Sequence, residues 1–90
     1  MPYYVIERRY ADELIPDPDE AADIRLINDD ESVRWLFSFL SADKRKTFCL
    51  YEAESAEAIR RAAYRAGLPS DVIVEVTDRI LPDGSLHPVG

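Results

Sequence analysis

Cysteine, histidine and glycine are scarce in this chain: among 90 residues there are one cysteine, one histidine and three glycines. A single cysteine excludes an intrachain disulfide. There is no C-x-x-C or H-E-x-x-H motif of the kind that binds zinc. The glycines are not clustered, and no G-x-S-x-G nucleophile motif is present. The sequence therefore lacks the short motifs of common metalloenzymes, nucleotide-binding proteins and hydrolases.

Positive charge is also in short supply, since the formal net charge is -7. Nucleic acids and anionic membrane surfaces attract basic patches, so neither is expected as a partner. Half of the 18 acidic residues lie between Asp12 and Glu31, where Arg25 is the only base. Such a run is typical of a solvated helix face, although it also suits a cation or a basic partner.

Long hydrophobic runs are missing too. No apolar stretch reaches the roughly 20 residues of a membrane span, and no charged segment followed by an apolar one resembles a secretion signal. We therefore expect a cytoplasmic protein. The hydrophobic content of 47% is ordinary for a globular chain. The length predicts one domain over residues 1–80, followed by a flexible tail at 81–90, where prolines and glycines recur.

Four segments are rich in aromatic and β-branched residues and are predicted as strands. They are Pro2–Tyr10, Ser32–Ser41, Thr47–Ala53 and Asp71–Thr77. A helix is predicted from Pro18 to about Asn28, because Asp17 can cap it and proline suits its first position. A second helix should begin after Ser55 and end at Gly67.

The order of these elements is βαββαβ, which is typical of the ferredoxin-like fold. We therefore predict an α+β protein with a four-stranded antiparallel sheet and two helices on one face. Strict alternation leaves large apolar residues on both faces of that sheet. A second copy packed face to face would cover the side without helices, and this predicts a homodimer in the form of a dimeric α/β barrel. A bulge in Ser32–Ser41 would exchange the two faces of that strand.

Alternation groups several reactive side chains on the face that the second copy would cover. They are Glu7, Cys49, Tyr51 and Glu75, with Trp35 beside them. Carboxylates in an apolar chamber suit a general base or a divalent metal, and a tyrosine can donate a hydrogen bond to an oxyanion. The structural alternatives are an ion pair for Glu7, solvent exposure for Glu75, and core packing for the other three side chains.

Three stretches resemble a widespread family of small bacterial proteins of unknown function, some of which are labelled nickel-binding or nickel-responsive. The stretches are "YYVIER" at Tyr3–Arg8, "VRWLFSFLSADKRKTFCLYEAES" at Val33–Ser55 and "EAIRRAAYRAGLPSDVIVEV" at Glu57–Val76. The resemblance implies a dimeric ferredoxin-like fold and a relation to Ni²⁺ or another divalent metal. The residues that match the family pattern around the central hairpin are Ser38, Asp43, Cys49, Tyr51 and Glu52.

These observations leave three functions open. The first is a dimeric binding module for a metal ion or small ligand. The second, by analogy of fold, is a cofactor-free enzyme of the monooxygenase or isomerase type. The third is a structural interaction domain without a site. The sequence does not decide whether the protein is an enzyme.

Overall fold

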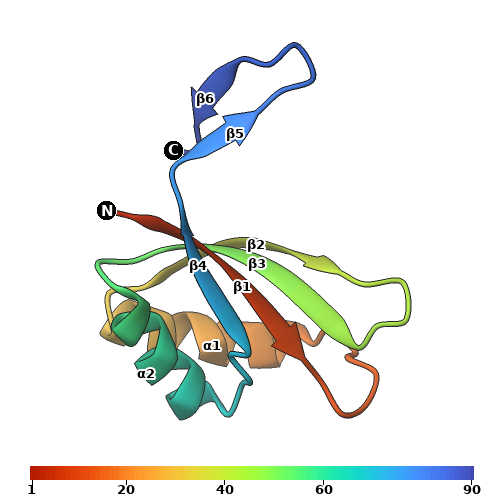
Figure 1. Ribbon diagram of the computed structural model, residues 1–90. Helices are drawn as coiled ribbons and strands as arrows, with labels where there is room; N and C mark the ends of the chain where they lie inside the picture. Colours follow the sequence, from red (N-terminus) through yellow and green to blue (C-terminus); the bar gives the residue numbers. More distant parts are fainter.

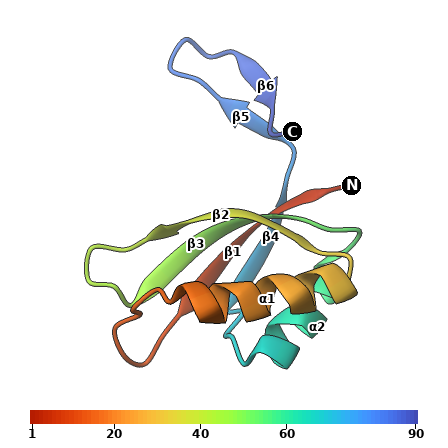
Figure 2. The same cartoon turned by 180° about the vertical axis from the view of Figure 1, so that it is seen from behind.

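The computed structural model describes all 90 residues and has two layers, a four-stranded antiparallel sheet with two helices on one face (Figures 1 and 2). The elements are β1 (Tyr3–Arg9), α1 (Pro18–Asp30), β2 (Arg34–Leu40), β3 (Lys46–Glu52), α2 (Ala56–Ala66), β4 (Val72–Val76), β5 (Asp78–Ile80) and β6 (Leu86–Pro88). The strand order is β2-β3-β1-β4, with every neighbouring pair antiparallel. The predicted α+β fold is confirmed and is consistent with the ferredoxin-like arrangement.

Both helices begin, and α2 also ends, where the sequence signals place them, while α1 runs to Asp30, two residues beyond the predicted Asn28. The side chain of Asp17 accepts a hydrogen bond from the backbone of Asp19 at 2.9 Å, and Pro18 follows it in the first turn. Ser55 accepts from the backbone of Ala58 at 3.3 Å, and Gly67 ends the second helix with φ of 69°. These contacts satisfy backbone groups that have no partner within the helix.

The core lies between the helices and the sheet. Ile6 of β1 and Ile59 of α2 are completely buried at its centre. The remaining core residues are Tyr4, Val33, Cys49, Tyr51, Ala53, Ala58 and Ala62. Small residues on α2 allow the helix to lie close to the sheet. Only 13 of the 90 residues are buried, which is a small core for a stable domain.

The register between strands corrects the predicted grouping of faces. Ile6 pairs with Cys49, and both point toward the helices. The sequence analysis placed the cysteine on the opposite face from Ile6, because alternation within each strand does not fix the phase between strands. In β2 a bulge falls between Trp35 and Phe37, so that Trp35 and Ser38 share the helix side.

Three rows of paired residues therefore face the helices, and three rows lie on the other side, which we call the open face. The helix-side rows are Trp35–Tyr51–Tyr4–Glu75, Ser38–Cys49–Ile6–Ile73 and Leu40–Thr47–Arg8. The open-face rows are Arg34–Glu52–Tyr3–Val76, Phe37–Leu50–Val5–Val74 and Phe39–Phe48–Glu7–Val72.

The C-terminal residues form a second, two-stranded sheet, where the sequence analysis expected a flexible tail over residues 81–90. β5 and β6 pair so that Ile80 lies opposite Leu86, and Gly84 turns the chain with φ of 84°. No strand was predicted here, although a D-G turn between short apolar segments is a hairpin signal; the flexibility of residues 81–90 stays a prediction. In both views the β5–β6 hairpin stands on the side of the sheet away from the helices.

Neither helix of the protein is long and apolar enough to cross a membrane.

Candidate functional site

The candidate residues of the sequence analysis do not meet in one place. Glu7 lies on the open face and binds Arg9, with 2.6 Å between its Oε2 and the arginine Nε. Cys49 and Tyr51 are buried on the helix side, whereas Glu75 lies in a helix-side row but on the edge strand, where it is exposed. The predicted chamber that combines these four side chains is therefore not formed, because Glu7 is on the other face of the sheet.

Tyr51 belongs to a buried polar cluster with Arg8 and Asn28. The guanidinium of Arg8 lies 5.6 Å from the centre of the tyrosine ring and donates to its hydroxyl at 3.4 Å, and also donates to the carbonyl of Pro69. Burial raises the pKa of Tyr51, while the positive charge of Arg8 acts in the opposite direction. Asn28 is buried with its side-chain nitrogen unpaired. None of the cavities is lined by these three side chains, so their role is structural, within the core.

The sequence analysis did not select Arg8 or Asn28 as notable residues. The signal for Arg8 was present, since it continues the alternation of Tyr4 and Ile6 and therefore had to point toward the helices. An arginine at such a position must find partners in the core. Nothing local in the sequence indicates that Asn28, near the end of α1, is buried.

Cys49 packs as a small core residue. It is only 4% exposed, and its sulfur lies 3.5 Å from the hydroxyl of Thr47. That hydroxyl also exchanges a hydrogen bond with Tyr10 at 3.2 Å. A thiol enclosed in this way matches the structural alternative of the sequence analysis.

Asp43 organises the turn between β2 and β3. Its carboxylate accepts hydrogen bonds from the hydroxyl of Ser41 at 2.6 Å and from the backbone of Arg45 at 3.0 Å. These bonds, with the serine contributing most, lower the pKa of Asp43. They stabilise a turn in which Lys44 adopts a positive φ of 62°. The exposed carboxylate of Asp43 therefore serves to stabilise this turn.

The residues of one chain do not fit a transition-metal site. No group of three or more histidine, cysteine, aspartate or glutamate side chains is arranged to hold a metal ion. Nickel favours histidine nitrogen supported by thiolate or carboxylate. Here the cysteine is enclosed in the core, and His87 is on the β5–β6 hairpin, on the other side of the sheet from the helices.

A cleft of about 440 Å³ opens on the helix side between the start of α1 and the β2–β3 half of the sheet. We call it the helix-side cleft. Its walls are mainly apolar or aromatic and include Trp35, the one member of the predicted chamber that reaches it. The other lining residues are Leu14, Ile15, Pro16, Asp17, Pro18, Glu20, Ala21, Ile24, Ser38, Leu40 and Thr47. The segment before α1 closes one side of this space.

A few polar groups lie in the helix-side cleft, at its floor and among its walls. The indole nitrogen of Trp35 donates to the hydroxyl of Ser38 at 2.9 Å, which fixes the ring against the strand. Thr47 contributes a second hydroxyl, and the carboxylates of Asp17 and Glu20 belong to the same lining. An apolar space with a few fixed polar groups and a volume between about 300 and 1,000 Å³ is the usual make-up of a small-ligand site.

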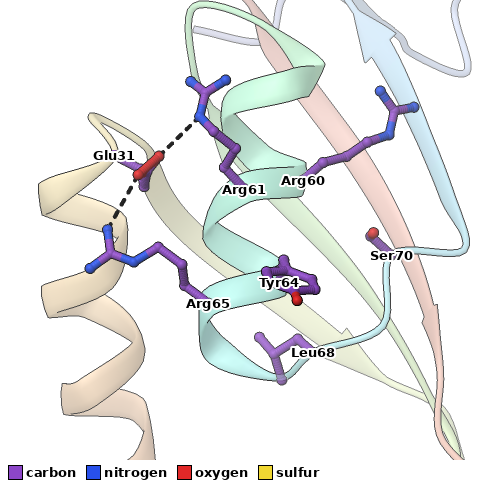
Figure 3. A pocket seen from close by; sticks show the side chains of 7 residues that line it. All are labelled: Glu31, Arg60, Arg61, Tyr64, Arg65, Leu68 and Ser70. Atoms are coloured by element: carbon purple, nitrogen blue, oxygen red, sulfur yellow. Dashed lines mark hydrogen bonds and ion pairs between the residues drawn. The ribbon is translucent and has the colours of Figure 1, made fainter.

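A second hollow lies on the outer surface of α2 (Figure 3). Glu31, at the end of α1, lies between two arginines of α2 and bonds to Arg61 at 3.1 Å and Arg65 at 3.2 Å. Arg65 also binds Asp30 at 2.7 Å, and Arg60 binds Glu57 at 2.7 Å. The pairs made by Arg61 and Arg65 link α2 to the end of α1, whereas the Arg60–Glu57 pair lies within α2. Because each arginine is already paired with a carboxylate of its own chain, this surface offers no free positive charge.

The open face is the third notable surface. Its exposed apolar side chains come from three of the four strands of the main sheet, β2, β3 and β4, and Phe39 is 65% exposed. The others are Phe37, Phe48, Val72 and Val74. The two phenylalanines of β2 stack edge to face, with ring centres 5.4 Å apart. A shallow hollow of about 230 Å³ lies where this face meets the base of the β5–β6 hairpin.

Comparison with known proteins agrees with the architecture. The family model described as "Nickel responsive protein SCO4226-like" matches residues 4–76. The chain belongs to this family. The crystal structure of SCO4226 from Streptomyces coelicolor A3(2) is similar over 82% of this chain and 94% of that chain, with 27% sequence identity and a TM-score of 0.64. No curated protein sequence matches the chain. The family resemblance expected from the sequence is therefore confirmed.

Proposed function

We propose that this protein is a homodimeric binding module for a small organic ligand. Each chain holds a largely apolar molecule with a neutral or cationic polar group in its helix-side cleft, and two chains join through their open faces. The observation that carries the ligand proposal is the cleft itself, an apolar space with two hydroxyls and an ordered indole.

The charge around the helix-side cleft favours this class of ligand. Asp17 and Glu20 are part of the lining, and Asp19 and Asp23 follow on the same helix. No lysine, arginine or histidine lines the cleft. A carboxylate or phosphate would be repelled here, whereas an amine or a hydroxyl would not.

The dimer proposal is supported by the surface that the chain exposes. The accessible surface is 6094 Å², whereas a compact monomer of this mass exposes about 5,400 Å². The excess of roughly 700 Å² is close to the ~800 Å² that each partner contributes to a standard interface. Large apolar side chains remain exposed on the open face, and an apolar surface of this kind is typical of an interface.

The family description points to nickel, but the donor atoms of this chain do not converge on one point. We therefore propose an organic ligand and place no metal in the helix-side cleft. Calorimetric titration with Ni²⁺ separates the two possibilities, since the protein should take up no stoichiometric metal at micromolar concentration. Stoichiometric uptake that Cys49→Ala or His87→Ala abolishes would instead support the metal function.

Trp35 is the only tryptophan of the chain, so its fluorescence reports directly on the helix-side cleft. Phenethylamine, 2-phenylethanol and phenylacetate have the same apolar body with a cationic, neutral or anionic head. We expect saturable changes with the first two and at least tenfold weaker binding of phenylacetate, because of the acidic lining.

Ala21→Phe fills the cleft and should weaken binding of phenethylamine at least tenfold. The matched control is Ala66→Phe, because Ala66 is also a half-buried helix residue but lies outside the cleft. A Trp35 signal that none of the three probes changes at millimolar concentration would reject the ligand site. Equal binding by the two variants would place the ligand elsewhere.

A further inference from the structure

We propose that the β5–β6 hairpin is an arm that holds the second copy of the chain, packing its apolar side against the partner's open face. This inference rests on the proposed dimer and adds to it the segment that secures the contact. The partner is a second copy because the open face, the hairpin and the hollow between them belong to every chain, so that one two-fold operation satisfies both arms.

The hairpin has no adequate support within its own chain. Its strands are three residues long, and they contact each other far more than they contact the main sheet. A lone two-stranded hairpin is at best marginally stable in water. Ile80 and Leu86 are paired across it and are 76% and 64% exposed. These two side chains form an apolar surface that nothing in the chain covers.

The base of the hairpin positions this apolar surface beside the open face. Asp78, Arg79 and Val89 form one wall of the hollow whose other lining residues, apart from Cys49, belong to the open face. A side chain at Gly90 would overlap the ring of Tyr3, so the end of the arm is held against β1. The hairpin then projects away from the sheet (Figures 1 and 2). A partner placed on the open face would lie within its reach.

The charges of the open face allow it to meet a copy of itself. Its two carboxylates are both paired with arginines, Glu7 with Arg9 at 2.6 Å and Glu52 with Arg34 at 3.7 Å. The acidic excess of the chain is concentrated on α1 and the segment before it, on the other side of the sheet. Two copies can therefore meet without bringing their acidic regions together.

The chain is also less compact than a typical single domain of its length, as expected for a projecting arm. Its radius of gyration is 13.6 Å, compared with about 12 Å for a compact domain of this length. The family model ends at residue 76, and the hairpin begins two residues later. The arm is thus an addition to the family's domain rather than a part of its core.

Sedimentation velocity over a dilution series of the full-length chain tests the arm. The double variant Ile80→Ser/Leu86→Ser should raise the dissociation constant of the dimer at least tenfold. The control is Leu26→Ser on α1, which removes a leucine of similar exposure, 68% against 64% for Leu86, from the opposite side of the molecule. It should dimerise like the wild type.

The possible results distinguish the proposal of the arm from the proposal of the dimer. A wild-type chain that stays monomeric at micromolar concentration overturns both proposals. A wild-type dimer whose dissociation constant is the same in the double variant and the control overturns the arm alone. Hydrogen exchange adds a second readout: amides of residues 78–88 should gain protection as concentration rises through the dissociation constant, and protection independent of concentration would show that the hairpin packs within its own chain.

Discussion

The two faces of the main sheet are built from the same four strands, yet they differ in every respect that matters for stability. On the helix side, Ile6 is completely buried, and even Arg8, in the next row, is only 2% exposed. On the open face, the row Phe37–Leu50–Val5–Val74 leaves Phe37 49% and Val74 51% exposed. Alternation in the sequence places apolar residues on both sides, but only one side has helices to cover it. The chain therefore encodes a core and, on the other side of the same sheet, an uncovered apolar surface.

Truncation of one residue on each side of the sheet, Ile59 of α2 and Phe39 of β2, gives the largest expected difference. Ile59→Ala removes a fully buried side chain beneath the sheet and should lower the free energy of unfolding by about 2–5 kcal/mol. Phe39→Ala removes an exposed side chain and should change the unfolding of dilute, monomeric protein by less than about 0.5 kcal/mol. Urea denaturation at low concentration measures both values. A similar loss for the two variants would mean that the open face is packed within the single chain.

A smaller effect of burial on the helix side should appear at alkaline pH. Burial raises the pKa of Tyr51 on the helix side above that of an unfolded chain. The unfolded state then loses its proton first, so stability is fully present below about pH 10 and falls as pH rises through the folded pKa. Denaturation at pH 8 and 10.5 should show a weaker pH dependence for Tyr51→Phe than for the wild type.

Tyr64→Phe is the control for this experiment, because Tyr64 is 87% exposed on α2. It should keep the alkaline loss of stability that the wild type shows. An unchanged loss in Tyr51→Phe would indicate that the core opens to solvent before this tyrosine ionises.

Local signals predicted most of the fold. Asp17, Pro18, Ser55 and Gly67 mark helix boundaries through contacts made within a few residues, and the structure forms those contacts. The order of elements then leaves few ways to arrange one sheet. A D-G turn at Asp83 also signalled the C-terminal hairpin, although the short strands around it made the signal easy to overlook.

The candidate site depended on information that is not local. Whether Glu7 and Cys49 share a face is decided by the pairing of strands some 40 residues apart, which alternation within a strand does not specify. The bulge after Trp35 moves that side chain to the helix-side cleft, and sequence alone only indicated that a bulge would exchange the faces. The cleft itself requires the segment before α1 to fold over β2, which is a tertiary contact without a motif.

The central claim is that a second copy covers the open face, and sedimentation velocity of the wild type and Phe39→Asp at micromolar concentration tests it most directly. We expect the wild type to sediment with twice the mass of the 10.3 kDa chain. The variant should sediment as a folded monomer, because a carboxylate at this position would be buried without a partner in the dimer. A wild-type chain that is monomeric and fully folded under these conditions would contradict the account.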